Sequence, residues 1–358
     1  MSHYPFAGPH RFARNQWYIG AWSAEVGPEP LGRTILGEDV VFYRTSSGDV
    51  AALSGICPHR WAPLAKGRVV EDAIQCPYHG AAFDRSGRCT LVPSQPRTPP
   101  TLRLRAYPVI ERGPCIWIWP GDADLADALL LPDQDSLGLG AAGWRADYGG
   151  PVLVNARAQI ILENLFDQSH INFVHPQTLG GPESRSDPHQ DEVFDTRDRF
   201  CVVHRMAARA TDDSVRALFP DAGDYVAAHL HVELLGVSLI DAVGSRTFST
   251  DAAGGAPRAL GCMNFVHGLT PQTPTTTHYF NAVTRNFALD IAELSTFLVE
   301  HNAKVMREDI ALLEAIELSL DRVADARKEV TFAADAVAMQ VRRRIERIAA
   351  ADSRVVLI

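Results

Sequence analysis

The sequence has no excess of basic residues: 34 Lys and Arg against 43 Asp and Glu give a formal net charge of −9. Proteins whose main partner is nucleic acid need surplus Lys and Arg to bind phosphates, so we expect no nucleic-acid partner. No apolar run approaches the roughly 20 residues that span a bilayer, which argues against a membrane protein. The N-terminal residues also lack the basic, apolar and small-residue pattern of a secretory signal, so we expect a cytoplasmic location.

Cysteine is scarce as well, with only six in the chain, at positions 57, 76, 89, 115, 201 and 262. In a reducing compartment so few cysteines do not predict a disulfide framework. We expect four of them to be ordinary buried thiols. The other two, Cys57 and Cys76, each lie close to a histidine in the sequence.

With 358 residues the chain is longer than one hydrophobic core needs, which predicts two domains. Residues 1–125 contain short segments rich in β-branched and aromatic residues, separated by Gly, Pro, Asp and Ser, as in antiparallel strands joined by turns. Residues 126–358 mix strands with longer periodic segments that predict helices. The expected fold class is α+β, with a β-rich N-terminal domain and a C-terminal domain of helices on an antiparallel sheet.

The expected elements are defined by residue range. Strand candidates are 40–44, 50–55, 73–78, 103–111, 115–121, 200–208, 225–235 and 277–287, and helix candidates are 156–176, 290–323 and 333–351. The last helix carries apolar Val337, Val341 and Ile345 at four-residue steps, which indicates one buried stripe.

Residues 57–80, CPHRWAPLAKGRVVEDAIQCPYHG, pair one Cys with one His twice: Cys57 with His59, and Cys76 with His79. Structural zinc sites more often place two Cys together before two His. One Cys and one His in each half suit a two-iron cluster in which two Cys hold one iron and two His the other. Spacing alone favours the cluster and leaves zinc open.

A second candidate site lies in ENLFDQSHINFVHP, residues 163–176. Two His and a carboxylate that leave coordination positions open are typical of non-haem Fe(II) oxygenases. On one helix Asp167 would lie between His170 and His175 on a broad face, and Pro176 would end the helix. The alternative is a solvated polar face of an amphipathic helix. Flanking Ile and Phe residues favour partial burial, and buried polar groups need partners.

The two motifs resemble those of the Rieske non-haem iron oxygenases: Cys-x-His-x(15–17)-Cys-x2-His, and Asn-x2-Asp-x2-His-x4-His, which falls on Asn164, Asp167, His170 and His175. The resemblance implies a [2Fe–2S] cluster on Cys57, His59, Cys76 and His79, and a mononuclear Fe(II) on His170 and His175. It implies that Asp167 is a bridge rather than a ligand, hydrogen-bonded to His59 or His79 of a neighbouring subunit in a homotrimer, with Asn164 in a supporting position. From the residues alone Asp167 could equally be the third ligand.

The family pattern calls for a further carboxylate in a late helix, and Asp309 in KVMREDIALLEAIE is the candidate. On a helix it shares a face with Val305 and Leu313, where an unpaired Asp costs several kcal/mol unless it binds metal. Glu308 would turn about 100° away, toward Lys304, as a solvated residue does.

Further segments, among them NQWYIGAWSAEV, PLGRTILGEDVVFYR and IWIWPGD, resemble the vanillate and dicamba O-demethylase subgroup. That resemblance implies the oxygenase component of a monooxygenase that uses O2 and electrons from NAD(P)H through a reductase or ferredoxin. The implied reaction is O-demethylation of an aromatic acid with release of formaldehyde. His267 and Asn281 are the candidate substrate contacts. A Trp that dicamba-type enzymes use has no counterpart before residue 301, which suggests a different acid.

Three alternatives remain at this point. A ring hydroxylase or dioxygenase and an N-demethylase would use the same two metal sites on other substrates. A Rieske electron-transfer protein would lack an active mononuclear iron.

Overall fold

The computed structural model describes residues 5–6, 12–179, 192–250, 256–323 and 329–352. Its N-terminal part is built from three small antiparallel sheets, in the strand orders β1-β11-β10, β2-β3-β4-β9 and β5-β6-β7-β8. Their bounds are β1 (Tyr18–Trp22), β2 (Leu31–Ile35), β3 (Glu38–Arg44), β4 (Val50–Ser54), β5 (Arg68–Val70), β6 (Ala73–Gln75), β7 (Ala82–Phe83), β8 (Cys89–Leu91), β9 (Ala106–Tyr107), β10 (Val109–Arg112) and β11 (Cys115–Ile118).

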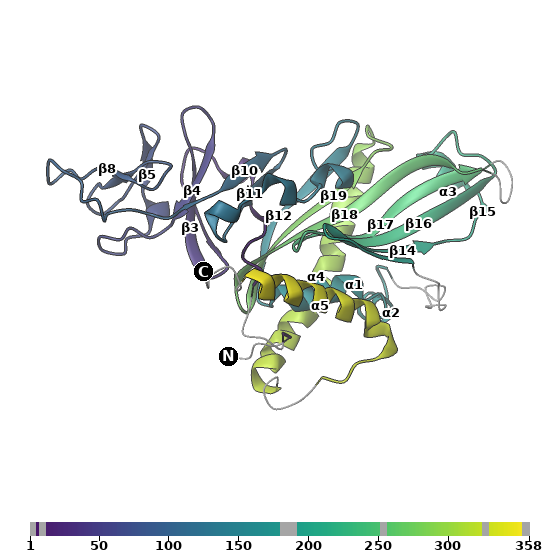
Figure 1. Cartoon of the computed structure of the whole chain (residues 1–358). Coiled ribbons are helices and arrows are strands. Elements are labelled where there is room, and N and C mark those ends of the chain that lie inside the picture. The colour runs from purple at the N-terminus through teal and green to yellow at the C-terminus, as the bar shows by residue number, and fades with distance from the viewer. Residues whose placement is uncertain (1–4, 7–11, 180–191, 251–255, 324–328, 353–358) are drawn as a thin grey trace.

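The second part is one large antiparallel sheet with helices on one face (Figure 1). The sheet runs β12-β19-β18-β17-β16-β14-β13, and β15 pairs with β16. The strands are β12 (Arg145–Val154), β13 (Glu192–Asp195), β14 (Arg199–Arg205), β15 (Arg209–Ala210), β16 (Tyr225–Leu235), β17 (Leu239–Thr250), β18 (Arg258–Thr273) and β19 (Thr276–Arg285). The helices are α1 (Ala158–Phe166), α2 (Ile171–Val174), α3 (Asp213–Leu218), α4 (Ala292–Val323) and α5 (Ala336–Asp352). None of the described helices is long and apolar enough to cross a bilayer.

Alternation along β18 assigns each face of the large sheet to a different core. Val266 points to the face where β1 and β11 pack, in a cluster with Trp117 and Trp119. Leu269 belongs to the opposite cluster, together with Ile160 of α1 and Met306 of α4. Because side chains alternate between faces, every second residue of β18 is directed toward the helices. Polar residues in this register, such as His267, are therefore placed beneath α1 and α4.

A bulge interrupts the β17–β18 ladder between Asp241 and Ser245. Val243 within it has φ +62°, a conformation that β-branched residues rarely adopt. The buried Asp241 carboxylate accepts a hydrogen bond from the backbone N–H of Phe265 at 2.9 Å and lies 2.6 Å from His231 Nε2. This carboxylate replaces a ladder bond that the bulge removes, so it holds the displaced segment in place.

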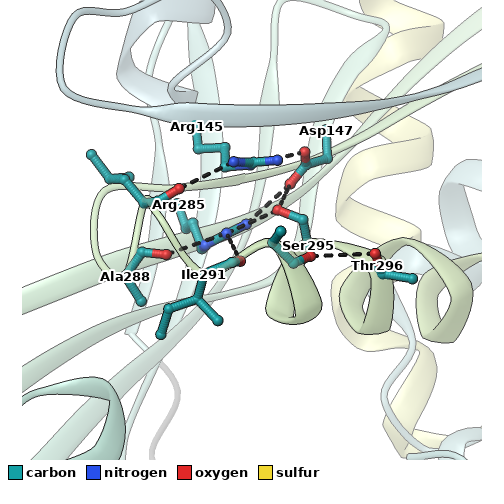
Figure 2. Close-up of polar contacts among 9 residues, drawn as sticks. Arg145, Asp147, Arg285, Ala288, Ile291, Ser295 and Thr296 are labelled. Carbon is teal, nitrogen blue, oxygen red and sulfur yellow. Dashed lines mark hydrogen bonds and ion pairs between the residues drawn. The ribbon is translucent and has the colours of Figure 1, made fainter.

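The start of α4 is anchored to β12 and β19 through a buried guanidinium, as Figure 2 shows. Arg285 is fully buried and donates to Asp147 at 3.0 Å, to Ser295 Oγ at 2.9 Å and to the carbonyl oxygen of Ile291 at 3.2 Å. Ser295 also donates to Asp147 at 2.7 Å. This network fixes where the long helix leaves the sheet, and with it the path of the residues further along α4.

The expected α+β class and the β-rich N-terminal domain are confirmed by the architecture and by its match to known structures reported below. The long helices expected at 290–323 and 333–351 correspond to α4 and α5. The single helix expected over 156–176 is wrong. Helix α1 ends at Phe166, Asp167 takes an extended conformation with ψ 107°, and a separate short helix follows at Ile171–Val174.

Candidate metal centres

Two loops of matched conformation carry the first candidate site. The N–H of Cys57 donates to the carbonyl of Ala62 at 2.9 Å, and the N–H of Cys76 donates to the carbonyl of Ala81 at 2.8 Å. The fourth residue after each Cys has positive φ: Trp61 at +59° and Gly80 at +75°. The two loops therefore repeat one turn, and Trp61 accepts a conformation that normally favours glycine.

The four donor side chains of these loops differ in exposure. Cys57 and Cys76 are buried, whereas His59 and His79 are exposed, with ring centroids 4.6 Å apart. This donor set fits a two-iron cluster whose thiolate-bound iron lies inside and whose imidazole-bound iron lies at the surface. Trp61 lies at the same tip, with 74% of its surface exposed.

Helix α1 brings the second motif against α4 and α5 through two buried ion pairs. Arg157, immediately before α1, donates to Glu317 of α4 through Nε at 2.7 Å, and Arg342 of α5 donates to Glu163 of α1 through Nε at 2.7 Å. Buried pairs of this kind are sensitive to the loss of either partner. They hold the start and the last turn of α1, after which the following residues turn into the site.

His170, His175 and Asp309 lie together, with one donor atom from each within 4.8 Å of the others. Asp309 Oδ1 is 3.0 Å from His175 Nε2 and 3.5 Å from His170 Nε2. Donors about 2.1 Å from one divalent ion and 90–110° apart are separated by roughly 3.0–3.4 Å. The arrangement thus fits a shared metal ion, and two histidines with one carboxylate leave positions open for other ligands.

The charge around these donors also favours a cation. Burial lowers the pKa of His170, but the hydrogen bond and negative charge of Asp309 outweigh it, so the pKa is raised overall. His175 is almost fully buried, so it does not lie on a solvent-facing polar side of a helix. The buried carboxylate calls for a positive charge beside it, which a bound metal ion or a proton on a histidine supplies.

A cavity of about 100 Å³ opens beside this triad, and its surface is mostly apolar, with Val243, Phe265 and Met306 among the residues that line it. His267 lines this cavity, and its Nδ1 lies 2.9 Å from the Tyr279 hydroxyl oxygen. Burial lowers the pKa of His267 to about 4, although the negative charge of Asp309 acts to raise it, so the ring is neutral at pH 7. Burial raises the pKa of Tyr279, so its hydroxyl keeps its proton and can either donate to Nδ1 or accept from Nδ1–H, depending on the His267 tautomer.

The other expected site residues fall in different places. Asn164 and Asp167 line the same cavity, and the Asn164 amide lies 3.4 Å from Asp309. Asp167 accepts a hydrogen bond from the Ser169 N–H at 2.8 Å. Asn281 is not among the residues that line the cavity; its amide instead lies 3.4 Å from the carbonyl of Gly150 on β12.

Sequence reasoning missed two residues that contact the expected site residues. Tyr279 carried no signal, because nothing in its position along the chain indicates that it meets His267. Glu308 was expected to face solvent near Lys304, and that expectation is wrong: its Oε2 lies 2.8 Å from His175 Nδ1. Its only sequence signal was its position next to Asp309.

Comparisons with known proteins cover the chain in two segments. Residues 16–108 match the Rieske [2Fe-2S] domain, and residues 154–351 match the vanillate O-demethylase oxygenase C-terminal domain. The predicted domain boundary at 125/126 falls between them.

Individual proteins match over nearly the whole chain. The oxygenase component of dicamba O-demethylase from Stenotrophomonas maltophilia is 33% identical, over 94% of this chain and 98% of that protein. The toluene-4-sulfonate monooxygenase system iron-sulfur subunit TsaM1 of Comamonas testosteroni is also 33% identical, over 96% and 98%. A crystal structure of dicamba monooxygenase with non-heme iron and dicamba is 30% identical, covers 96% of this chain and 99% of that chain, and superposes with a TM-score of 0.80.

Proposed function

Because this chain belongs to the Rieske non-haem iron monooxygenases, as an oxygenase component with the vanillate O-demethylase type of catalytic domain, we propose that it removes a methyl group from a methoxy-substituted aromatic acid. The observation that carries the proposal is the triad of His170, His175 and Asp309 at the edge of an apolar cavity. We place the division between the Rieske domain and the catalytic domain at residues 125/126.

In this proposal Cys57, His59, Cys76 and His79 hold the [2Fe–2S] cluster, and His170, His175 and Asp309 hold the mononuclear iron. When bound, the mononuclear iron supplies the activation of O2 that oxidises the substrate. The intact donor set argues against an electron carrier with a defunct second site, because such a protein has no need to keep three donors together.

The proposed reaction balances as an aryl methyl ether plus O2, two electrons and two protons giving the phenol, formaldehyde and water. The C–H bond of the methyl group is replaced by C–OH, and the resulting hemiacetal splits at the C–O bond. The two electrons come from NAD(P)H through a separate reductase, with or without a ferredoxin. The apolar lining of the cavity excludes water from the reacting carbon.

His267 is the proposed contact for the acid group. In this proposal the neutral ring has the tautomer in which the Tyr279 hydroxyl donates to Nδ1, so that Nε2–H is free to donate to the substrate. The described residues of the lining include no Lys or Arg, so the acid would be bound by hydrogen bonds rather than by a salt bridge. A donor gives a stronger bond to a carboxylate than to a neutral acceptor, so we expect the acid to bind more tightly than its amide. The names of two relatives contain dicamba and toluene-4-sulfonate, and both compounds are aromatic anions.

We also propose that the protein works as a homotrimer in which Asp167 hydrogen-bonds His59 or His79 of the next subunit. Asp167 borders the mononuclear site, and the two histidines lie on an exposed tip, as such a contact requires. The cluster of one subunit would then pass electrons to the iron of its neighbour.

The test is O2 uptake with formaldehyde detection over a panel of methoxybenzoic acids, their amides and unmethoxylated benzoic acids, with a generic reductase and NADH. We expect formaldehyde from at least one methoxy acid, in equal amount to the O2 consumed. O2 uptake and hydroxylated product from unmethoxylated acids, without formaldehyde from any methoxy acid, would instead identify a ring hydroxylase.

His170→Ala tests the second site directly. Removing one of three ligands should abolish turnover and reduce the iron content from three to about two per chain, while the Rieske absorption spectrum stays unchanged. Undiminished turnover in this variant would refute the assignment of the mononuclear site.

A further inference from the structure

Two successive acidic residues of α4 contact the same histidine from opposite sides of its ring. Asp309 Oδ1 lies 3.0 Å from His175 Nε2, and Glu308 Oε2 lies 2.8 Å from His175 Nδ1. Neighbouring residues on a helix project about 100° apart, so a single turn of α4 reaches both ring nitrogens. The imidazole is held between two carboxylates, of which only Asp309 faces His170.

The Glu308 carboxylate is itself held in place. The Thr178 hydroxyl donates to the same Oε2 at 2.7 Å. A carboxylate oxygen that faces Nδ1 at 2.8 Å acts as the acceptor, which places the proton of His175 on Nδ1. The lone pair of Nε2 is then directed toward Asp309 and His170, as metal binding requires.

His170 provides an internal comparison. Its Nδ1 contacts the backbone carbonyl of Asp167, which also fixes the proton on Nδ1 and frees Nε2. Both histidines thus present the same ring nitrogen, but their partners differ: a neutral carbonyl behind His170 and a carboxylate behind His175. A carboxylate partner raises the basicity of the histidine more strongly than a carbonyl does.

We propose that Glu308 is a positioning residue that fixes the tautomer and ring orientation of His175 and thereby raises the affinity of the mononuclear site for Fe(II). The inference rests on the proposed assignment of His170, His175 and Asp309 as the metal donors. It gives the adjacent acids separate roles: Asp309 binds the ion, and Glu308 holds the histidine opposite. Loss of such a partner typically weakens metal binding 10- to 100-fold.

The experiment measures the Fe(II) dissociation constant of the mononuclear site by anaerobic competition with a coloured chelator, with the Rieske absorbance counting folded protein. Glu308→Ala should bind Fe(II) about 10- to 100-fold more weakly. Glu308→Gln keeps a hydrogen-bond acceptor for Nδ1–H and should recover most of that loss. Glu300→Ala removes an exposed acid from the same helix and is the matched control, with wild-type affinity expected.

The outcomes separate this inference from the function on which it rests. If Glu308→Ala binds Fe(II) like the wild type while Asp309→Ala loses it, Glu308 has no positioning role and the metal site stands. If Glu308→Gln is as weak as Glu308→Ala, an acceptor at this position is not sufficient, which overturns the tautomer argument. If Asp309→Ala and His175→Ala both bind Fe(II) like the wild type, the donor assignment itself fails.

Discussion

Substituting Asp147 by Ala tests how the start of α4 is held to the large sheet. The change removes the acceptor that Arg285 contacts at 3.0 Å and Ser295 at 2.7 Å (Figure 2). The guanidinium stays fully buried and keeps only neutral acceptors, among them the carbonyl of Ile291 at 3.2 Å. An uncompensated buried charge costs about 3–5 kcal/mol, and the remaining acceptors place the expected loss near 3 kcal/mol.

In a domain of 150–250 residues, 1 kcal/mol shifts the melting temperature by roughly 2–4 °C, so Asp147→Ala should melt about 6–12 °C lower. The measurement is thermal unfolding followed by circular dichroism, with the Rieske absorbance recorded in parallel. The matched control is Asp49→Ala, which breaks an exposed pair with Arg85 at 3.7 Å and should leave the melting temperature unchanged.

A double variant completes this test. Replacing Arg285 by Met together with Asp147→Ala removes both charges, so it should be more stable than Asp147→Ala alone. The reasoning is refuted if Asp147→Ala melts like Asp49→Ala, or if the double variant is less stable than the single one. Either result would mean that the ion pair does not hold this junction.

Two further predictions concern the cavity and the Rieske tip. Burial lowers the pKa of His267 from 6.5 to about 4. Between pH 6.5 and pH 4 the folded protein therefore binds fewer protons than the unfolded chain. The stability that is present above pH 6.5 is lost as the pH falls toward 4. The free energy of unfolding, measured with denaturant, should be about 2 kcal/mol lower at pH 4.5 than at pH 7 because of His267, and His267→Gln should remove this part of the difference. A pH dependence in His267→Gln equal to that of the wild type would contradict the burial argument. Gly80→Ala should destabilise the tip by about 1–2 kcal/mol, because φ is +75° and the added Cβ would approach Pro93 to 2.9 Å. Trp61→Gly, at the matching turn position, should cost less than 1 kcal/mol in the same melting experiment, and equal losses in both variants would show that the two turns are not equivalent.

The sequence located both candidate metal centres because their donors are close along the chain. Cys57 with His59, and His170 with His175, sit in segments short enough for spacing to restrict the chemistry. The family resemblance, now supported by relatives over nearly the full length, added the bridge role predicted for Asp167. The element pattern of α4 and α5 was also readable, since long apolar periodicity indicates a helix with little dependence on its surroundings.

Other parts of the fold could not be read from local pattern. Strand β18 was outside the strand candidates, because Gly261, Gly268 and Pro271 resemble turn signals. The structure shows why one of them is needed: a Cβ on Gly268 would come within 2.7 Å of Ile19 of the N-terminal part. The break after Phe166 was missed for a related reason, since local periodicity continues past the point where Asp167 leaves the helix.

By itself the sequence determined which side chains are available for metal binding, because donor type and spacing are properties of the chain. Only the tertiary structure decided which of them meet. Helix periodicity gave the direction of Asp309 and Glu308 relative to α4, but not what lies in those directions. His175 directly follows the short helix α2, and it places one ring nitrogen against each acid. A contact between residues far apart in the chain depends on how the elements pack, and no local pattern records it.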